Sequence, residues 1–103
     1  MTPIIRQHHA ELVRLCEKYC VRRLEIFGSG ATGKGFDPAT SDLDFLVEYQ
    51  PIEADGYADA YFGLREELQT LFQCPVDLVM ERAIRNKYFR QGIMESRTTL
   101  YAA

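Results

Sequence analysis

The sequence predicts an α/β (α+β) fold. Apolar residues recur first at helical spacing, then in two short strand-like runs, then along a second helix that leads into a third strand. A strand–helix–strand unit normally forms a right-handed crossover that leaves its two strands parallel. With 103 residues, of which 47% are apolar, the chain 1–103 is expected to form one domain around one core.

The first half of the chain predicts one helix and two strands. Threonine and proline at positions 2 and 3 are typical of a helix start, and the helical period continues to about Cys20. Val21–Phe27 turns apolar at its end and predicts the first strand. Asp42–Tyr49 alternates between two faces, so it predicts a strand with one packed face and one that is polar at its entry.

The second half predicts a helix, a strand and a less regular C-terminal part. Apolar and tyrosine side chains recur at helical spacing from Tyr57 to about Phe72, and Val76–Met80 predicts the third strand. Asn86 is a candidate cap of a further helix. Near the C-terminus, Thr98–Tyr101 fits either a terminal strand or a tail.

Charge and composition favour a protein of the cytoplasm. The formal net charge is −3, which argues against a broad nucleic-acid-binding surface. There is no apolar run long enough to span a membrane and no secretory leader pattern. Three cysteines, an odd number, indicate a reducing compartment, where we expect them as small core thiols. A basic C-terminal region is either a solvated helix face or a nucleotide or partner contact; it comprises Arg82, Arg85, Lys87, Arg90 and Arg97.

A glycine-dense loop followed by paired carboxylates is the most informative stretch. Glycines crowd the loop from Gly28 to Gly35, where backbone N–H groups can approach an anion closely. Asp42 and Asp44 open the next strand two residues apart, so their side chains share a face. Neighbouring carboxylates repel each other unless a cation lies between them, and hard cations take oxygen ligands. The stretch therefore predicts an anion site beside a divalent-metal site.

A third carboxylate is expected at the same place. Asp77 lies near the start of its predicted strand, as Asp44 does near the start of the preceding one. If these strands are neighbours, Asp42, Asp44 and Asp77 converge on one edge of one sheet face. The plain alternatives are a flexible loop over positions 28–35 and solvent-facing strand acids.

These residues together resemble the nucleotidyltransferase superfamily that includes DNA polymerase beta. The matching pattern is Gly28-Ser29, a short glycine-rich turn, the Ser-Asp-x-Asp of residues 41–44 before an apolar strand, and a later lone aspartate at Asp77. The small size is similar to the minimal MNT-type branch found beside HEPN-domain proteins in toxin–antitoxin pairs. This resemblance implies a polymerase beta palm-like fold, a small mixed β-sheet with helices packed mainly on one face.

The resemblance also implies a nucleotide site. Gly28, Ser29 and Gly30 would hold the phosphates of ATP, with Lys34 as the nearest positive charge. One position departs from the family pattern, because Thr32 stands where the family commonly has arginine. Lysine offers a point charge rather than the bidentate fork of arginine.

The three aspartates would carry the chemistry that the resemblance implies, the Mg²⁺-dependent transfer of AMP from ATP to a hydroxyl. Asp42, Asp44 and Asp77 would be the catalytic and metal-binding residues, and Asp77 would also accept the proton of the attacking hydroxyl. Carboxylates suit this role because magnesium prefers hard oxygen ligands.

The implied acceptor is a tyrosine of a cognate HEPN toxin, which would make the chain its antitoxin. The chain has no room for a second domain, so we expect a partner or a second copy of the chain to complete the site. Two alternatives stay open at this stage. One is a nucleotidyltransferase acting on small molecules such as aminoglycosides, and the other is an antitoxin that neutralises its partner by contact alone.

Overall fold

Four strands and three helices make up the part of the chain that the computed structural model describes, residues 3–28, 31, 42–52, 56–80 and 97–103. The helices and strands follow one another in the order α1, α2, β1, β2, α4, β3, β4. Their bounds are α1 Pro3–Gln7, α2 His9–Lys18, β1 Val21–Phe27, β2 Leu43–Tyr49, α4 Gly56–Phe72, β3 Val76–Met80 and β4 Thr98–Ala102.

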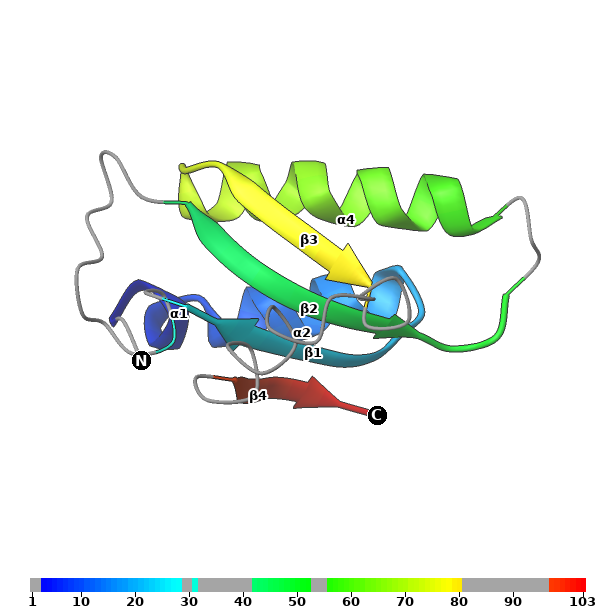
Figure 1. The fold of residues 1–103 in the computed structure, drawn as a ribbon, viewed down its shortest axis with the longest axis horizontal. Coiled ribbons are helices and arrows are strands. Elements are labelled where there is room, and N and C mark those ends of the chain that lie inside the picture. Colours follow the sequence, from blue (N-terminus) through cyan, green and yellow to red (C-terminus); the bar gives the residue numbers. More distant parts are fainter. Residues whose placement is uncertain (1–2, 29–30, 32–41, 53–55, 81–96) are drawn as a thin grey trace.

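The four strands form one mixed sheet in the order β3-β2-β1-β4 (Figure 1). β1 pairs with β2 and with β4 in antiparallel register. β2 and β3 are parallel and are joined through α4. The predicted strand–helix–strand crossover with parallel strands is therefore confirmed. In the strand order of the described residues, β3 and β4 are the two edges of the sheet.

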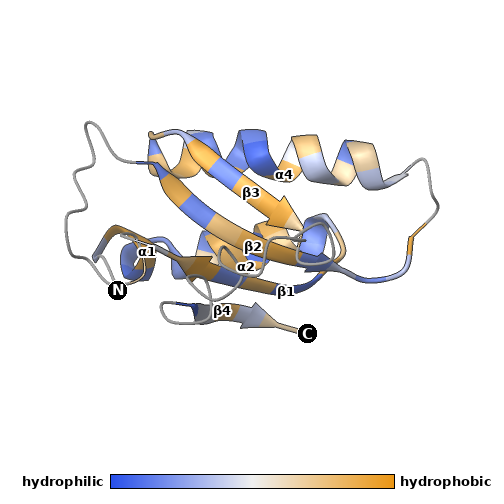
Figure 2. Ribbon diagram, in the orientation of Figure 1, coloured by the Kyte–Doolittle hydropathy of each residue, from blue (hydrophilic) through white to orange (hydrophobic). Residues whose placement is uncertain are grey.

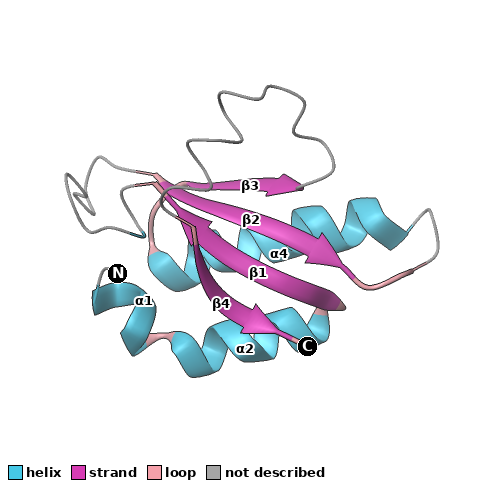
Figure 3. Cartoon of the chain, turned by 60° about the horizontal axis from the view of Figure 1, so that its bottom comes forward, coloured by secondary structure: helices cyan, strands magenta, loops and turns pink. Residues whose placement is uncertain are grey.

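Helices α2 and α4 pack against the same face of the sheet (Figure 3). The core between them and the strands includes Leu12 of α2, Leu64 and Leu68 of α4, and Leu24 and Phe45 of the central strands, all fully buried. Both β2 and β3 are mainly hydrophobic, with isolated hydrophilic bands (Figure 2). Because successive side chains point to opposite faces of a strand, one face of β2 and β3 packs against the helices and the other carries Asp44 and Asp77.

The second face of the sheet carries the acidic residues. A small apolar cluster of Phe27, Leu46 and Val79 lies on this face, separate from the main core. Asp44 is two residues from Leu46 and Asp77 is two residues from Val79, so both acids share that face. The predicted α/β architecture with helices mainly on one face is confirmed for the described residues.

The N-terminal helix is shorter and less continuous than predicted. Its pattern indicated one helix to about Cys20, but α1 and α2 are separated at His8 and α2 ends at Lys18. The His8 ring is half-buried and its Nδ1 lies 2.9 Å from the carbonyl oxygen of Ile4. The ring thus competes with the helical hydrogen bonds at the break. A local contact of this kind between a side chain and the backbone cannot be read from a periodic pattern.

The expectation of three core thiols is correct for two of them. Cys16 and Cys74 are buried, but Cys20 is exposed and has a positive φ of 58°. Cys20 lies beyond the end of α2, in the turn that leads into β1, so it does not share a helix face with Cys16. All three are free thiols.

The C-terminal residues form a strand rather than a tail. β4 adds to β1, and Leu100 points into the main core. The candidate helix after Asn86 and the basic residues at 82–90 lie outside the described residues. Arg97 is described, and it directly precedes β4. None of the described helices is long and apolar enough to cross a lipid bilayer.

Candidate active site

The end of β1 is shaped by a glycine. Gly28 has a φ of 72°, a left-handed conformation that side chains with a Cβ rarely adopt. A Cβ at this position would also come within 3.0 Å of Oδ2 of Asp44. The backbone N–H of buried Ala31 donates to the Gly28 carbonyl over 3.1 Å, which closes the turn. Glycine is therefore required here both for the turn and for the close approach of the carboxylate.

Strand register places two of the predicted carboxylates side by side. Phe27 at the end of β1 pairs with Asp44, and Asp44 pairs in parallel register with Asp77 of β3. Neighbouring strands lie about 4.8 Å apart, and partners in register point to the same face. The backbone N–H of Leu43 also donates to the Pro75 carbonyl over 3.0 Å. This bond fixes the starts of β2 and β3 relative to each other.

The electrostatics of Asp44 are those of a crowded carboxylate. Burial raises the pKa of Asp44, and the negative charges of Asp77 and Asp42 raise it further. Each of these causes makes the ionised form of Asp44 costly in the free protein. A bound cation would relieve the repulsion, so this carboxylate has a physical reason to bind one.

Asp42 lies at the rim of the site. It is exposed and directly precedes β2, which begins one residue later than predicted. The pKa of the nearby Cys74 thiol is raised, first by burial of the thiol and then by the negative charge of Asp42. Within the described part of the chain, no three acidic, histidine or cysteine side chains close into a ready-made metal cluster. The three acids lie at the same end of the sheet and offer the carboxylate oxygens that a hard cation prefers. Their side chains do not form a preassembled metal site.

The remaining predicted site residues fall outside the described part of the chain. These are Ser29, Gly30 and Lys34, together with the Thr32 position that departs from the family pattern. Their roles in phosphate binding stay predictions. Of the predicted set, the structure brings together Gly28, Asp42, Asp44 and Asp77.

A buried ion pair that the sequence does not predict lies on the same face of the sheet as the acids. Glu25 of β1 is 4% exposed and accepts hydrogen bonds from Arg97, with the Arg97 Nε 2.8 Å from Oε2. These hydrogen bonds are the main reason that the pKa of Glu25 is lowered. For the basic C-terminal region that includes Arg97, the sequence predicts either a solvated helix face or a nucleotide or partner contact; in the structure, Arg97 joins the start of β4 to β1.

The ion pair continues across the sheet as a row of alternating charges. Arg23 Nε lies 3.1 Å from the Glu25 carboxylate, and a second Arg23 nitrogen lies 3.1 Å from Glu48 of β2. Arg23 and Glu25 are two residues apart in β1, and this spacing puts them on one face. The two-residue spacing of Arg23 and Glu25 was the sequence signal for opposite charges on one face. It did not reveal the charge row, because the other members are Glu48 of β2 and Arg97, which precedes β4.

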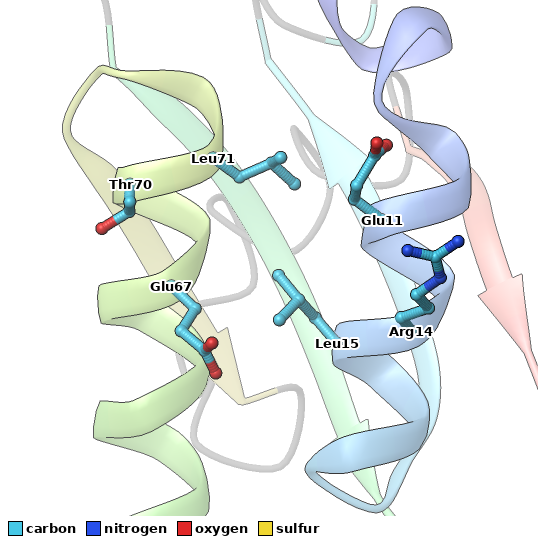
Figure 4. Close-up of a pocket in the computed structure, with 6 residues that line it drawn as sticks. All are labelled: Glu11, Arg14, Leu15, Glu67, Thr70 and Leu71. Atoms are coloured by element: carbon cyan, nitrogen blue, oxygen red, sulfur yellow. The ribbon is translucent and has the colours of Figure 1, made fainter.

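Two pockets lined by described residues lie on the opposite, helical side of the molecule. One is a groove between α2 and α4, where Leu15 and Leu71 point toward each other (Figure 4). Another lies beside Tyr19, Cys20 and Ile52. Neither includes an aspartate of the site, so we base the candidate site on the carboxylates and not on a pocket.

Comparison with known proteins assigns the fold and the acids to a family. A family model described as a nucleotidyltransferase domain matches residues 11–100. The chain belongs to the nucleotidyltransferase domain family. The matched range contains Gly28, Asp42, Asp44 and Asp77. The chain is therefore a nucleotidyltransferase, as its sequence pattern predicts.

Relatives from Methanocaldococcus jannaschii carry the name "putative protein adenylyltransferase". One is 38% identical over 92 residues, covering 89% of this chain and 86% of the relative. A second is 36% identical over 93 residues, with the same coverage of both chains. These nucleotidyltransferases are thus similar to the chain over almost its whole length.

Solved structures with the same fold include toxin–antitoxin complexes. A structure described as a minimal nucleotidyltransferase superposes with a TM-score of 0.73 at 26% identity, covering 91% of this chain and 90% of that one. A toxin–antitoxin structure with AMP-PNP gives 0.67 at 19% identity, covering 92% and 73%. A complex of an AMPylated HEPN toxin with an MNT antitoxin from Shewanella oneidensis gives 0.62 at 18% identity, covering 95% and 72%.

Proposed function

We propose that this nucleotidyltransferase transfers AMP from ATP to a hydroxyl of a partner protein, a tyrosine of a cognate HEPN toxin, and so acts as its antitoxin. The observation that carries the proposal is the register pairing of Asp44 with Asp77 beside the Gly28 turn. The names of the relatives, and the complexes formed by proteins of the same fold, support a protein acceptor.

The reaction breaks one bond and forms one. The acceptor oxygen attacks the α-phosphorus of ATP, the bond from that phosphorus to the bridging oxygen of the β-phosphate breaks, and pyrophosphate leaves. Backbone N–H groups of the turn after β1 would hold the phosphates. Asp77, exposed at the start of β3, would accept the proton of the attacking hydroxyl.

Mg²⁺ is the cation that we propose for the acids. Asp44 and Asp77 would hold it, with Asp42 at the rim, because hard cations prefer carboxylate oxygens. When bound, it would supply charge neutralisation for the leaving pyrophosphate. The raised pKa of Asp44 fits this role, since a cation offsets the crowding of negative charge that raises it.

The test is transfer of labelled AMP to the product of the neighbouring gene, which we expect to be a HEPN-domain protein. The reaction contains labelled ATP, Mg²⁺ and both proteins, and label is read after denaturing electrophoresis. We expect label on the partner, and loss of about two orders of magnitude or more in rate for Asp44→Asn and for Asp77→Asn, as for groups that stabilise developing charge. Mass spectrometry then locates the modified residue, which we expect to be a tyrosine.

Glu48→Gln is the matched control. Glu48 lies on β2, on the face of Asp44, but it pairs with Arg23 instead of facing Asp77. We expect this variant to label the partner at nearly the wild-type rate. Absence of label with the wild type, together with normal neutralisation by Asp44→Asn, would favour an antitoxin that acts by contact alone. Label on small alcohols and never on protein would favour a small-molecule enzyme.

A further inference from the structure

The free edge of β3 is covered by side chains of α4. Among the described strands β3 pairs with β2 alone, and the Pro75 carbonyl already points to β2, where it accepts from Leu43. Successive residues of a strand direct their backbone groups to opposite sides. The backbone groups of Val76 and Leu78 therefore point to the free edge, where unpaired donors and acceptors would otherwise be left.

Three side chains of α4 form hydrogen bonds with both backbone groups of Val76 and with the Leu78 carbonyl. Gln69 Oε1 accepts from the backbone N–H of Val76 over 3.2 Å. The Arg65 Nε donates to the Val76 carbonyl over 3.4 Å, and the Tyr61 hydroxyl donates to the Leu78 carbonyl over 2.6 Å. The three residues are four positions apart, so they form one stripe along the helix. This stripe takes the place of a further strand.

The stripe holds the backbone on both sides of Asp77. Gln69 and Arg65 fix the residue before it, and Tyr61 fixes the residue after it. Helix α4 itself is anchored through Leu64 and Leu68, which are fully buried in the core. Asp77 is exposed, and its strand is held by β2 on one side and by the stripe on the other. The direction of its backbone therefore depends on α4 as well as on β2.

We propose that Tyr61, Arg65 and Gln69 are positioning residues, which hold β3 so that the Asp77 carboxylate faces Asp44. This inference rests on the proposed function, because it assumes that the two carboxylates act together on a cation. The three residues touch neither substrate nor cation. They act through the β3 backbone, as outer residues orient the ligands of metal sites.

The test uses two variants that each remove one polar group of the stripe. Tyr61→Phe deletes only the hydroxyl, and Gln69→Leu deletes the acceptor, whereas Gln69→Glu keeps an acceptor oxygen and should restore wild-type behaviour. Tyr57→Phe is the matched control, since it removes the same group from the same helix, where it contacts the Ile52 backbone instead of β3. Thermal unfolding of every variant checks that the fold is retained.

Two readouts are needed. Amide hydrogen exchange at Asp77 and Val79, followed by NMR, reports whether β3 is held. We expect faster exchange there in Tyr61→Phe and Gln69→Leu, and no change in Tyr57→Phe. Titration with Mn²⁺ as the probe, followed by water proton relaxation, reports the paired carboxylates. We expect Mn²⁺ affinity to fall about three- to tenfold, somewhat less than for partners that contact a ligand directly.

A double-variant comparison separates positioning from general destabilisation. If the stripe acts through Asp77, Tyr61→Phe should cause no further loss of Mn²⁺ affinity in the Asp77→Asn background. Unchanged exchange at Asp77 and Val79, unchanged Mn²⁺ affinity in Tyr61→Phe, or an equal loss in the Asp77→Asn background would each overturn the proposal. If the wild type binds no Mn²⁺, the proposed function fails instead, while the exchange data still show whether the stripe holds β3.

Discussion

Asp44 shows how a single residue can serve a site at the expense of the fold. Its pKa is raised, by burial first and then by Asp77 and Asp42. An acid whose pKa is raised in the folded state binds protons more tightly there than in the unfolded chain. Its contribution to stability therefore falls as pH rises through its ordinary value of 3.8 toward the raised one, and it stays unfavourable at neutral pH.

We therefore expect Asp44→Asn to raise the melting temperature of the ligand-free protein at pH 7 while it abolishes transfer. The amide keeps the shape of the side chain and removes the repelled charge. Thermal unfolding at pH 7 and at pH 3.5 checks the electrostatic cause, because the gain should shrink at the lower pH. A drop in melting temperature at pH 7 would show that Asp44 makes a stabilising contact in the free protein.

The pKa of Glu25 is shifted in the opposite direction from that of Asp44. Its pKa is lowered by hydrogen bonds from Arg97, against an opposing effect of burial. An acid whose pKa is lowered stabilises the fold above its ordinary value of 4.5 and loses that contribution as pH falls below it. We expect the urea-unfolding free energy of the wild type to fall in this acidic range, with a shallower fall in Glu25→Gln. Parallel slopes in the two proteins would contradict a role for this pair.

At the scale of elements, the same ion pair joins two strands. Replacing Glu25 with alanine would leave Arg97 without its main carboxylate at the β1–β4 junction, and the Arg97 side chain is only 20% exposed. We expect a loss on the order of 2–3 kcal/mol, below the fully buried range because part of Arg97 reaches water. Urea unfolding measures it, and Glu48→Ala, at the more exposed end of the charge row, should cost clearly less.

A glycine within α4 is explained by its neighbour. A Cβ at Gly63 would lie 2.7 Å from Cε1 of Tyr19, whose hydroxyl is hydrogen-bonded to Glu67. Alanine favours helix by about 1 kcal/mol over glycine, yet we expect Gly63→Ala to destabilise the protein because the Tyr19 ring must move. In a Tyr19→Leu background, Gly63→Ala should instead stabilise the protein, because the ring that the Cβ would meet is gone. Chemical denaturation of the four proteins tests this, and a gain from Gly63→Ala with Tyr19 present would contradict it.

Elements with a clear period could be predicted from the sequence, and those shaped by contacts could not. β1 and β3 have the predicted bounds, and α4 differs by about a residue, because their apolar periods are strong. The break at His8 depends on a local side-chain contact, and the exposure of Cys20 on a positive backbone φ. A periodic pattern of apolar residues encodes neither. The Glu25–Arg97 pair joins residues 72 positions apart. Such a pair becomes visible only when β4 is placed beside β1.

At the scale of the whole molecule, the topology creates the site. Placing β2 between β1 and β3 brings the Gly28 turn, Asp44 and Asp77 to one end of the sheet, although they are far apart in sequence. Gly28, Asp42 and Asp44 could be predicted because they lie in one compact motif, and Asp77 because it lies near the start of the next predicted strand. The side chains that hold them, Tyr61 and Gln69 of α4, could not, because their partners are backbone groups of an edge strand.

The central claim is that the carboxylates at this end of the sheet and the Gly28 turn together bind a nucleoside triphosphate with its cation. A crystal structure of the protein with Mg²⁺ and a non-hydrolysable ATP analogue tests it most directly. We predict a cation between the carboxylates of Asp44 and Asp77, with the phosphates on the backbone of the turn. Nucleotide bound in the groove between α2 and α4, or an empty carboxylate pair at saturating nucleotide, would contradict it.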